Sequence, residues 1–327
     1  GRLLAVAVLL LLSFPLAGTP AGPASWLPFA AGEALALPIS PSDGGRFPEV
    51  VERVREQDPT AYTFSRAWIA ETERKKAVRA QVARGEISLE GMSPPQIREL
   101  TAVTGTRYVP VMLGRYSDTG ADPITAANLQ TELFDGPWPT GTMKEYYDEV
   151  SYGDISLTGT VYNWVTTSNT DDYYCGGEWG LDPVDSRTGE FITEVLQAND
   201  AAIDFSQYDN DGPDNLPDSG DDDGFVDFVA IVHPEEGGEC GPGPSHDMWS
   251  HRWQLAGWPQ GVFTTNDART GGGFIRINDY TIMPALSCGG TMIEIGVFCH
   301  EFGHAFGLPD LYDTSTQGAN CTTDFGE

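Results

Sequence analysis

The sequence predicts an α+β protein in which a small helical module precedes a larger domain of strands and helices. Apolar residues recur at helical spacing over residues 48–84, with one break expected near Pro59. After residue 105, short apolar runs typical of buried strands alternate with helical stretches. Because hydrophobic residues make up 40% of the 327 residues, the chain can bury a substantial core.

The N-terminal residues have the pattern of a secretory signal peptide. Arg2 precedes an apolar run, and small residues and prolines follow that run. The run is shorter than the roughly 20 apolar residues that a membrane-spanning helix needs. We therefore expect residues 1–24 to be a signal peptide and the protein to be secreted and extracellular, with no stable membrane span. An uncleaved signal anchor is the alternative.

Charge divides the chain near Gly105. Residues 1–105 contain 11 basic and 11 acidic residues, whereas residues 106–327 contain 7 basic and 37 acidic residues and so carry the whole net charge of −30. Such an acidic body repels nucleic-acid phosphates, so we expect no nucleic-acid partner. We expect residues 25–105 to form a prosegment, a linker followed by helices, and residues 106–327 to form the functional domain. A helical spacer without inhibitory contact is the alternative for the prosegment, and the oligomeric state is unknown.

Six elements are expected in the functional domain. Apolar density favours buried strands, alternation favours an edge strand, and a stop at glycine marks the end of each helix. We predict strands at 108–113, 155–165 and 225–234, an edge strand within 271–286, and helices at 142–150 and 291–306.

The last predicted helix carries the segment VFCHEFGHAFGLPD, residues 297–310, which holds two of the five histidines in the chain. On a helix, His300 and His304 lie on one face about one turn apart, so both rings can reach a single zinc ion. Glu301 lies beside that ion, where it can take a proton from a zinc-bound water. This donor set is typical of peptide-bond hydrolysis, and two ordinary helix histidines with a surface glutamate are the alternative.

A catalytic zinc takes a third protein ligand and keeps one position open for water. Gly307 can end the helix in a left-handed conformation, and the chain then turns back towards Asp310. Asp310 is therefore the local candidate for the third ligand. A carboxylate beyond Glu327 is the competing candidate.

The stretch YDNDGPDNLPDSGDDDGFVDF concentrates carboxylates beside glycines, an arrangement that suits calcium. Residues 213–222 interrupt the spacing of the ligands. If they loop out, a calcium pattern reassembles from Asp209, Asp211, Asp223, the Phe225 carbonyl and Asp227. A solvated acidic loop without an ion is the alternative.

The cysteines and the remaining histidines are less informative. Five cysteines leave one without an intrachain partner, and Cys321 is the candidate for it. His246 and His251 lie beside Trp249 and Trp253, which favours local packing over a second metal site.

The segment IGVFCHEFGHAFGLPDLYD resembles the signature of the M6, or immune inhibitor A-like, family of secreted metalloproteases. TRYVPVMLGRYSDT, MKEYYDEVSYGDISLTGTV and DMWSHRW resemble further stretches of that family, in the same order. The resemblance implies a zincin-like fold, with a mixed sheet above an active-site helix and a second subdomain after it. It also implies an extracellular zinc endopeptidase that is made as a proenzyme and acts on proteins or peptides.

The resemblance assigns the roles described above to His300, Glu301, His304 and Asp310. The family also has a methionine-bearing turn after the metal signature, whereas the last methionine here is Met292. We therefore expect a C-terminal subdomain that is truncated in this sequence.

Two functional hypotheses follow. The first is a secreted zinc endopeptidase precursor in which Glu301 activates a zinc-bound water. The second is a catalytically silent, calcium-stabilised extracellular binding module that retains a metal site. Glu301 favours the first hypothesis, because a purely structural zinc site needs no general base.

Overall fold

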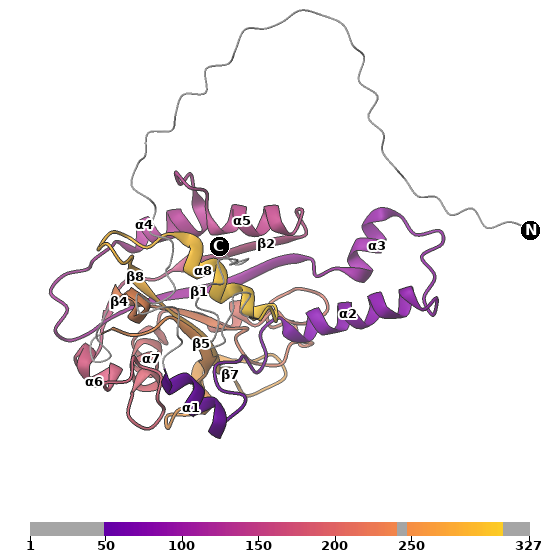
Figure 1. Ribbon diagram of the computed structural model, residues 1–327. Coiled ribbons are helices and arrows are strands. Elements are labelled where there is room, and N and C mark those ends of the chain that lie inside the picture. The colour runs from indigo at the N-terminus through magenta and orange to yellow at the C-terminus, as the bar shows by residue number, and fades with distance from the viewer. Residues whose placement is uncertain (1–48, 241–246, 310–327) are drawn as a thin grey trace, which may run out of the picture. The chain divides into compact units, whose positions relative to one another are not determined.

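The computed structural model describes residues 49–240 and 247–309. Its centre is a six-stranded mixed sheet with the strand order β2-β1-β4-β8-β5, in which β3 also pairs with β1 (Figure 1). The strands β1, β2, β3, β4 and β8 are parallel, and β5 pairs antiparallel with β8. The strand bounds are β1 Gly105–Arg115, β2 Ile155–Val161, β3 Val165–Thr166, β4 Val229–Glu236, β5 His251–Gln254 and β8 Asp279–Leu286.

Helices cover both faces of this sheet. Successive side chains of a strand point to opposite faces, and here both sets of side chains are apolar and buried. In β4, Ala230 and Val232 face one apolar core, whereas Val229 and Ile231 face the other. Figure 1 shows α5 and α8 on one side of the strands and α7 on the other. The first core is covered by α4 Ala126–Gln130, a π-helical turn η1 Thr131–Asp135, α5 Met143–Val150 and α8 Ile295–Ala305; the second is covered by α1 Glu49–Gln57, α6 Asp171–Cys175, α7 Thr188–Asn199 and the 3-10 turn η2 Phe205–Tyr208.

The helix α8 carries the histidine segment and lies inside the first core. Phe298 and Phe302 are fully buried there, so one stripe of the helix is fixed against the sheet. Gly307 adopts a φ of 82°, and the Leu308 amide donates to the Gly303 carbonyl 3.3 Å away. The predicted stop at Gly307 is confirmed, because this left-handed residue closes the last turn. The helix begins at Ile295, four residues later than predicted.

Two other helices begin with a reciprocal pair of capping hydrogen bonds. The helix α5 is preceded by Thr142, whose hydroxyl accepts from the Glu145 amide while the Glu145 carboxylate accepts from the Thr142 amide. Ser93 and Gln96 form the same reciprocal arrangement before α3 Pro94–Thr101. Both pairs satisfy amides that a helix start leaves without a partner.

The edge strand predicted within 271–286 is confirmed only in its first half. Its second half forms β8, which lies between β4 and β5, and its first half forms β7 Phe274–Ile277, which pairs with β6 Phe263–Ala268 in a separate two-stranded sheet. The polar residues that suggested a solvent face are buried instead. The Asp279 carboxylate accepts from the Ser65 and Arg66 amides, so a segment distant in sequence supplies its partners.

The other strand predictions differ in their bounds. The stretch 155–165 divides into β2 and β3, and the strand predicted from Phe225 begins at Val229. Asp227 therefore belongs to the loop that leads into β4. That loop carries the acidic residues considered below.

The N-terminal described residues divide into two parts. The break in the first predicted helix extends from the end of α1 to the start of α2 Ile69–Ala83, and it contains Tyr62 and Trp68, which are buried in the two cores. The helices α2 and α3, by contrast, have no buried residue. Residues 50–68 thus share their cores with the chain after Gly105, and the expected domain boundary at residue 105 stays a prediction.

Cys240, at the end of the 3-10 turn η3 Gly238–Cys240, forms a disulfide with Cys288. Cys175 and Cys299 are buried thiols. None of the described helices combines the length and the apolar character that crossing a membrane requires. The expected signal peptide, the residues after Pro309, Cys321 and His246 lie outside the described residues.

Candidate metal centre

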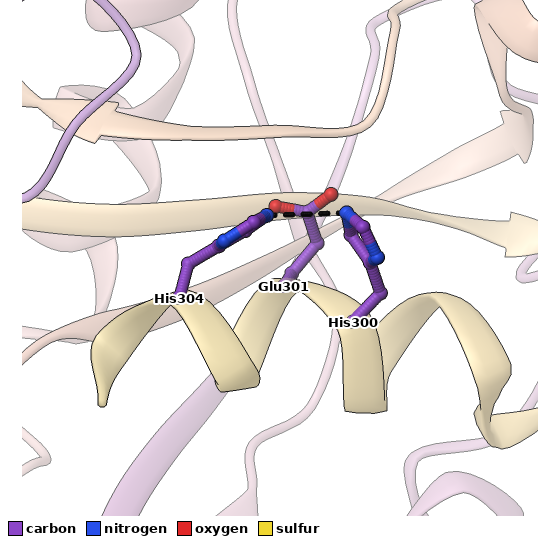
Figure 2. A group of neighbouring side chains, drawn as sticks. All are labelled: His300, Glu301 and His304. Carbon is purple, nitrogen blue, oxygen red and sulfur yellow. Dashed lines mark hydrogen bonds between the residues drawn. The ribbon is translucent and has the colours of Figure 1, made fainter. Parts of the chain in front are cut away.

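The two histidines of α8 converge as the spacing predicts. Figure 2 shows both rings on one side of the helix, and their Nε2 atoms are 3.1 Å apart. Two nitrogens that each lie roughly 2.0–2.1 Å from a tetrahedral zinc are about 3.3 Å apart. The observed separation therefore fits a shared zinc ion without rearrangement of either ring.

A hydrogen bond to the main chain orients the second histidine. Nδ1 of His304 lies 2.6 Å from the Leu308 carbonyl, which can only accept, so Nδ1 carries the proton and Nε2 keeps a lone pair for a metal. The Leu308 carbonyl is in place because Gly307 turns the chain back at the end of α8. His304 is buried and His300 is partly exposed, so the site opens towards solvent on the His300 side.

Glu301 lies beside the converging nitrogens (Figure 2). Its ligand oxygen and the two imidazole nitrogens lie within 4.8 Å of one another. The residue is 5% exposed, and Oε2 has no hydrogen-bond partner within the described part of the chain. A buried carboxylate oxygen normally has a partner, so this one fits a water or an ion at the site.

Side chains that the sequence did not single out hold α8 in place. Tyr147 of α5 donates from its hydroxyl to the Cys299 carbonyl at 2.7 Å, next to His300. Phe302 packs edge-on against Phe228, with ring centroids 5.0 Å apart. Tyr147 and Phe228 support α8 through contacts between segments that are distant in the sequence, so no local spacing of residues predicts these contacts.

The acidic loop forms a second cluster. Ligand oxygens of Asp209, Asp211 and Asp227 lie within 4.8 Å of one another. Oδ1 of Asp209 and Oδ1 of Asn210 are buried and make no hydrogen bond with any described residue. Three carboxylates and unpaired buried oxygens form the kind of donor set that a hard cation takes.

The electrostatics of this cluster favour a cation. Burial, followed by the charges of Asp222, Asp223 and Asp211, raises the pKa of Asp209 to about 8. Burial and neighbouring carboxylates also raise the pKa of Asp211 to about 6, and burial raises that of Asp227 well above its ordinary value. A bound cation would reverse these shifts by stabilising the ionised carboxylates.

One of the five expected calcium ligands, Asp223, makes another contact. The Asp223 carboxylate forms an ion pair with Arg66 at 2.7 Å. The Phe225 ring has the guanidinium groups of Arg66 and Arg276 near its centre, each at 3.8 Å. The structure thus brings together the carboxylates of Asp209, Asp211 and Asp227, and it does not bring the Asp223 carboxylate into that cluster.

The insertion at 213–222 folds onto its own ends. The Asp222 carboxylate accepts from the Gly212 amide at 2.7 Å and from the Ser219 amide at 2.9 Å. This closure joins the two ends of the insertion, so Asp211 and Asp227 can meet although 15 residues separate them.

The remaining sequence-predicted residues are placed as follows. Asp310, the expected third zinc ligand, lies outside the described residues. His251 lies 2.8 Å from the Trp249 carbonyl through Nδ1 and 3.0 Å from the Tyr280 hydroxyl through Nε2. These contacts agree with local packing of His251.

A mixed sheet above a buried helix that presents His-Glu-x-x-His fits the zincin-like class of metalloproteases. The family described as Immune inhibitor A peptidase M6, catalytic domain, matches residues 130–326, and the chain belongs to this family. The resemblance found in the sequence is therefore confirmed.

Two curated relatives show the same relationship. Immune inhibitor A of Bacillus thuringiensis subsp. alesti is 35% identical over 193 residues, which cover 54% of this chain and 26% of that protein. The pre-pro-metalloprotease PrtV of Vibrio cholerae serotype O1 is 32% identical over 213 residues, which cover 60% of this chain and 22% of the relative. The matched part is thus about a quarter of each relative's length.

Proposed function

We propose that this chain belongs to the precursor of a secreted zinc endopeptidase that hydrolyses proteins or peptides. The observation that carries this proposal is the convergence of His300 and His304 to 3.1 Å between their Nε2 atoms, beside Glu301, whose Oε2 has no hydrogen-bond partner among the described residues. The family match and the names of the relatives support a peptidase. The signal pattern of residues 1–24 supports secretion.

His300 and His304 would hold the zinc ion through their Nε2 atoms. When bound, zinc supplies a Lewis acid that polarises the scissile carbonyl and lowers the pKa of water. Glu301 would take the proton from the attacking water and then pass it to the leaving amine. The hydrogen bond from Nδ1 of His304 to the Leu308 carbonyl supports this assignment, since it leaves Nε2 available for the metal.

We propose Asp310 as the third zinc ligand. The left-handed turn at Gly307 ends α8 and directs the chain back towards the histidines, which supports a ligand only a few residues further along. A carboxylate beyond Glu327 stays the competing candidate. Asp310→Asn and Asp310→Ala variants would separate the two, because loss of zinc is expected only if Asp310 is a ligand.

We also propose that the cluster of Asp209, Asp211 and Asp227 binds calcium as a structural ion. Its support is the buried Oδ1 of Asp209, which has no hydrogen-bond partner in the described part of the chain and lies beside the carboxylates of Asp211 and Asp227. The Phe225 carbonyl stays a proposed ligand, and Asp223 would join only after rearrangement, since its carboxylate pairs with Arg66.

Processing of the expected prosegment, residues 25–105, should leave residues 50–68 with the domain. Trp68 and Tyr62 fill the two cores, and the Asp279 carboxylate takes its hydrogen bonds from the Ser65 and Arg66 amides. Removing these residues would create cavities and leave a buried carboxylate without partners, which together cost several kcal/mol.

The test compares the full-length gene product that contains this chain with its Glu301→Gln variant, after activation by limited proteolysis. We expect the variant to bind zinc as the wild type does and to cleave an unfolded protein substrate about 10²–10⁴-fold more slowly. Equal cleavage by both proteins would refute the peptidase mechanism. Zinc binding without cleavage by the wild type would instead support the silent binding module.

A further inference from the structure

Trp68 connects the two candidate metal sites. Its side chain is fully buried, and its indole Nε1 donates to Oδ2 of Asp227 at 2.8 Å. Its backbone amide donates to the Ala305 carbonyl, in the last turn of α8, at 3.0 Å. One residue therefore contacts both a carboxylate of the acidic cluster and the end of the zinc-binding helix.

The contacts between Trp68 and α8 lie at the C-terminal end of the helix, where main-chain carbonyls lack partners inside the helix. The last carbonyls of a helix have no partner inside it, and the Trp68 amide supplies one to Ala305. The Trp68 and Phe306 rings lie 4.5 Å apart at their centroids. A Cβ on Gly307 would lie 3.6 Å from Ile69, so Ile69 also contacts the turn that places the Leu308 carbonyl against His304.

The contacts on the acidic side fix Asp227 from two directions. One carboxylate oxygen accepts from Trp68, and the other lies 3.4 Å from the Asn210 amide. A cation in the cluster would hold the Asp227 carboxylate in one orientation. The indole hydrogen bond would transmit that orientation to Trp68, since a bond to an ionised acceptor is strong and directional.

A second path runs through aromatic rings. Phe228 follows Asp227 and packs edge-on against Trp68, with centroids 5.1 Å apart. The same ring packs edge-on against Phe302, the neighbour of Glu301. The acidic cluster, Trp68 and α8 thus form one continuous packed unit.

We propose that Trp68 is a positioning residue that couples cation occupancy of the acidic cluster to the zinc-binding geometry of α8. The coupling rests on the proposed zinc and calcium sites. Because linkage is reciprocal, calcium should raise the affinity for zinc by the same factor as zinc raises the affinity for calcium.

The experiment measures the zinc affinity of the full-length gene product by competition with a chelator, with and without saturating calcium. For the wild type we expect calcium to tighten zinc binding about 10-fold, within the usual range of coupling between sites. Trp68→Phe keeps a ring in the core but removes the indole donor. In this variant we expect both metals to bind and the effect of calcium on zinc affinity to fall below about twofold.

Trp258→Phe is the matched control. Its indole also donates in a buried hydrogen bond, to the Tyr280 hydroxyl at 2.8 Å, but it lies in the core on the other side of the sheet from α8 and Trp68. We expect this control to keep the full calcium effect. Full coupling in Trp68→Phe, or equal loss of coupling in both variants, would overturn the role of Trp68.

Hydrogen exchange on the wild type provides a measurement that does not depend on folding of a variant. Calcium should slow exchange of the Phe306 and Leu308 amides at the end of α8, and unchanged exchange would overturn the coupling. A wild type that binds no zinc would refute the proposed function itself. A wild type that binds both metals independently would refute only the coupling.

Discussion

The two candidate metal clusters of this molecule are built in opposite ways. His300, Glu301 and His304 come from one helix, so the hydrogen bonds of α8 bring them together before an ion binds. Asp209, Asp211 and Asp227 come from the two ends of a loop, and their like charges repel where they meet. The helix cluster is thus preformed, whereas the acidic cluster depends on the surrounding fold and on a cation.

Because the two clusters differ in this way, we expect the zinc ion and the calcium ion to have different roles. A zinc ion on a preformed helix contributes chiefly to the chemistry, because the fold already places its ligands. A calcium ion among repelling carboxylates contributes chiefly to stability, because it offsets a repulsion that the folded state would otherwise contain. The predictions below test this division, beginning with the largest effect.

Replacing a zinc ligand should abolish zinc binding with little damage to the fold. His300→Ala removes a partly exposed ring from α8, so the core around Phe298 and Phe302 stays intact. We expect zinc affinity to fall by more than the roughly 100-fold loss that follows removal of a residue behind a ligand. Metal analysis after dialysis measures this, with Glu301→Gln as the control that keeps its zinc. Retention of zinc by His300→Ala would contradict the assignment.

Glu132, in η1, shows what burial does to a carboxylate outside both clusters. It is fully buried, and neither oxygen has a hydrogen-bond partner among the described residues. Burial, followed by the charge of Glu294, raises the pKa of Glu132 from 4.5 to about 8. Because the folded-state pKa is the higher one, the stability that this group contributes is full below about pH 4.5 and is lost as the pH rises through about 8.

The size of the Glu132 effect follows from the shift. At about 1.4 kcal/mol for each pKa unit, the loss is on the order of 4 kcal/mol. Glu132→Gln cannot ionise, so its stability should change less between about pH 5 and about pH 9 than that of the wild type. Urea unfolding at both pH values measures this difference. Parallel pH profiles for the two proteins would show that Glu132 is not held in its neutral form.

Asp209→Asn should raise the stability of the protein without calcium and lower the stabilisation that calcium provides. Without calcium and above about pH 8, where the Asp209 carboxyl ionises, the amide removes a buried charge from among Asp211, Asp222 and Asp223, so the variant should be more stable than the wild type. With calcium at about 100 times its Kd, the wild type should gain about 2.7 kcal/mol, and the variant should gain much less. Thermal unfolding with and without calcium measures both signs.

A chelator control separates calcium from zinc in that experiment. A zinc-selective chelator should lower the melting temperature less than a calcium chelator does. If calcium leaves the stability of both proteins unchanged, the cluster is a solvated acidic loop.

The smallest expected effect is at Tyr147. Its hydroxyl donates to the Cys299 carbonyl inside the core, and a buried hydrogen bond contributes about 1 kcal/mol. Tyr147→Phe should lower the free energy of unfolding by about that amount and leave zinc affinity nearly unchanged. A large loss of zinc affinity would show that α8 depends on α5 for its geometry, so the helix cluster would not be preformed.

The sequence predicted the helix cluster because its information is local. A spacing of four residues places His300 and His304 on one face of any helix, and Gly307 marks the helix end. The acidic cluster was predicted only in part. Whether Asp223 belongs to it depends on Arg66, which lies in a segment expected to be a separate prosegment.

Other features could not be predicted because they depend on contacts between distant segments. The alternation around Asp279 suggested an edge strand, but Ser65 and Arg66 satisfy its carboxylate and allow β8 to lie inside the sheet. The burial of Trp68 has the same origin. Apolar spacing suggested a helix there, whereas the indole packs against Phe306 after α8 and against Phe228 before β4.

The central claim is that one zinc ion is held by the imidazoles of His300 and His304. X-ray absorption at the zinc edge, measured on the full-length gene product loaded with zinc, tests this most directly. We predict one zinc per chain with two imidazole nitrogens at roughly 2.0–2.1 Å. A protein that takes up no zinc, or a zinc ion with no imidazole in its shell, would contradict the account.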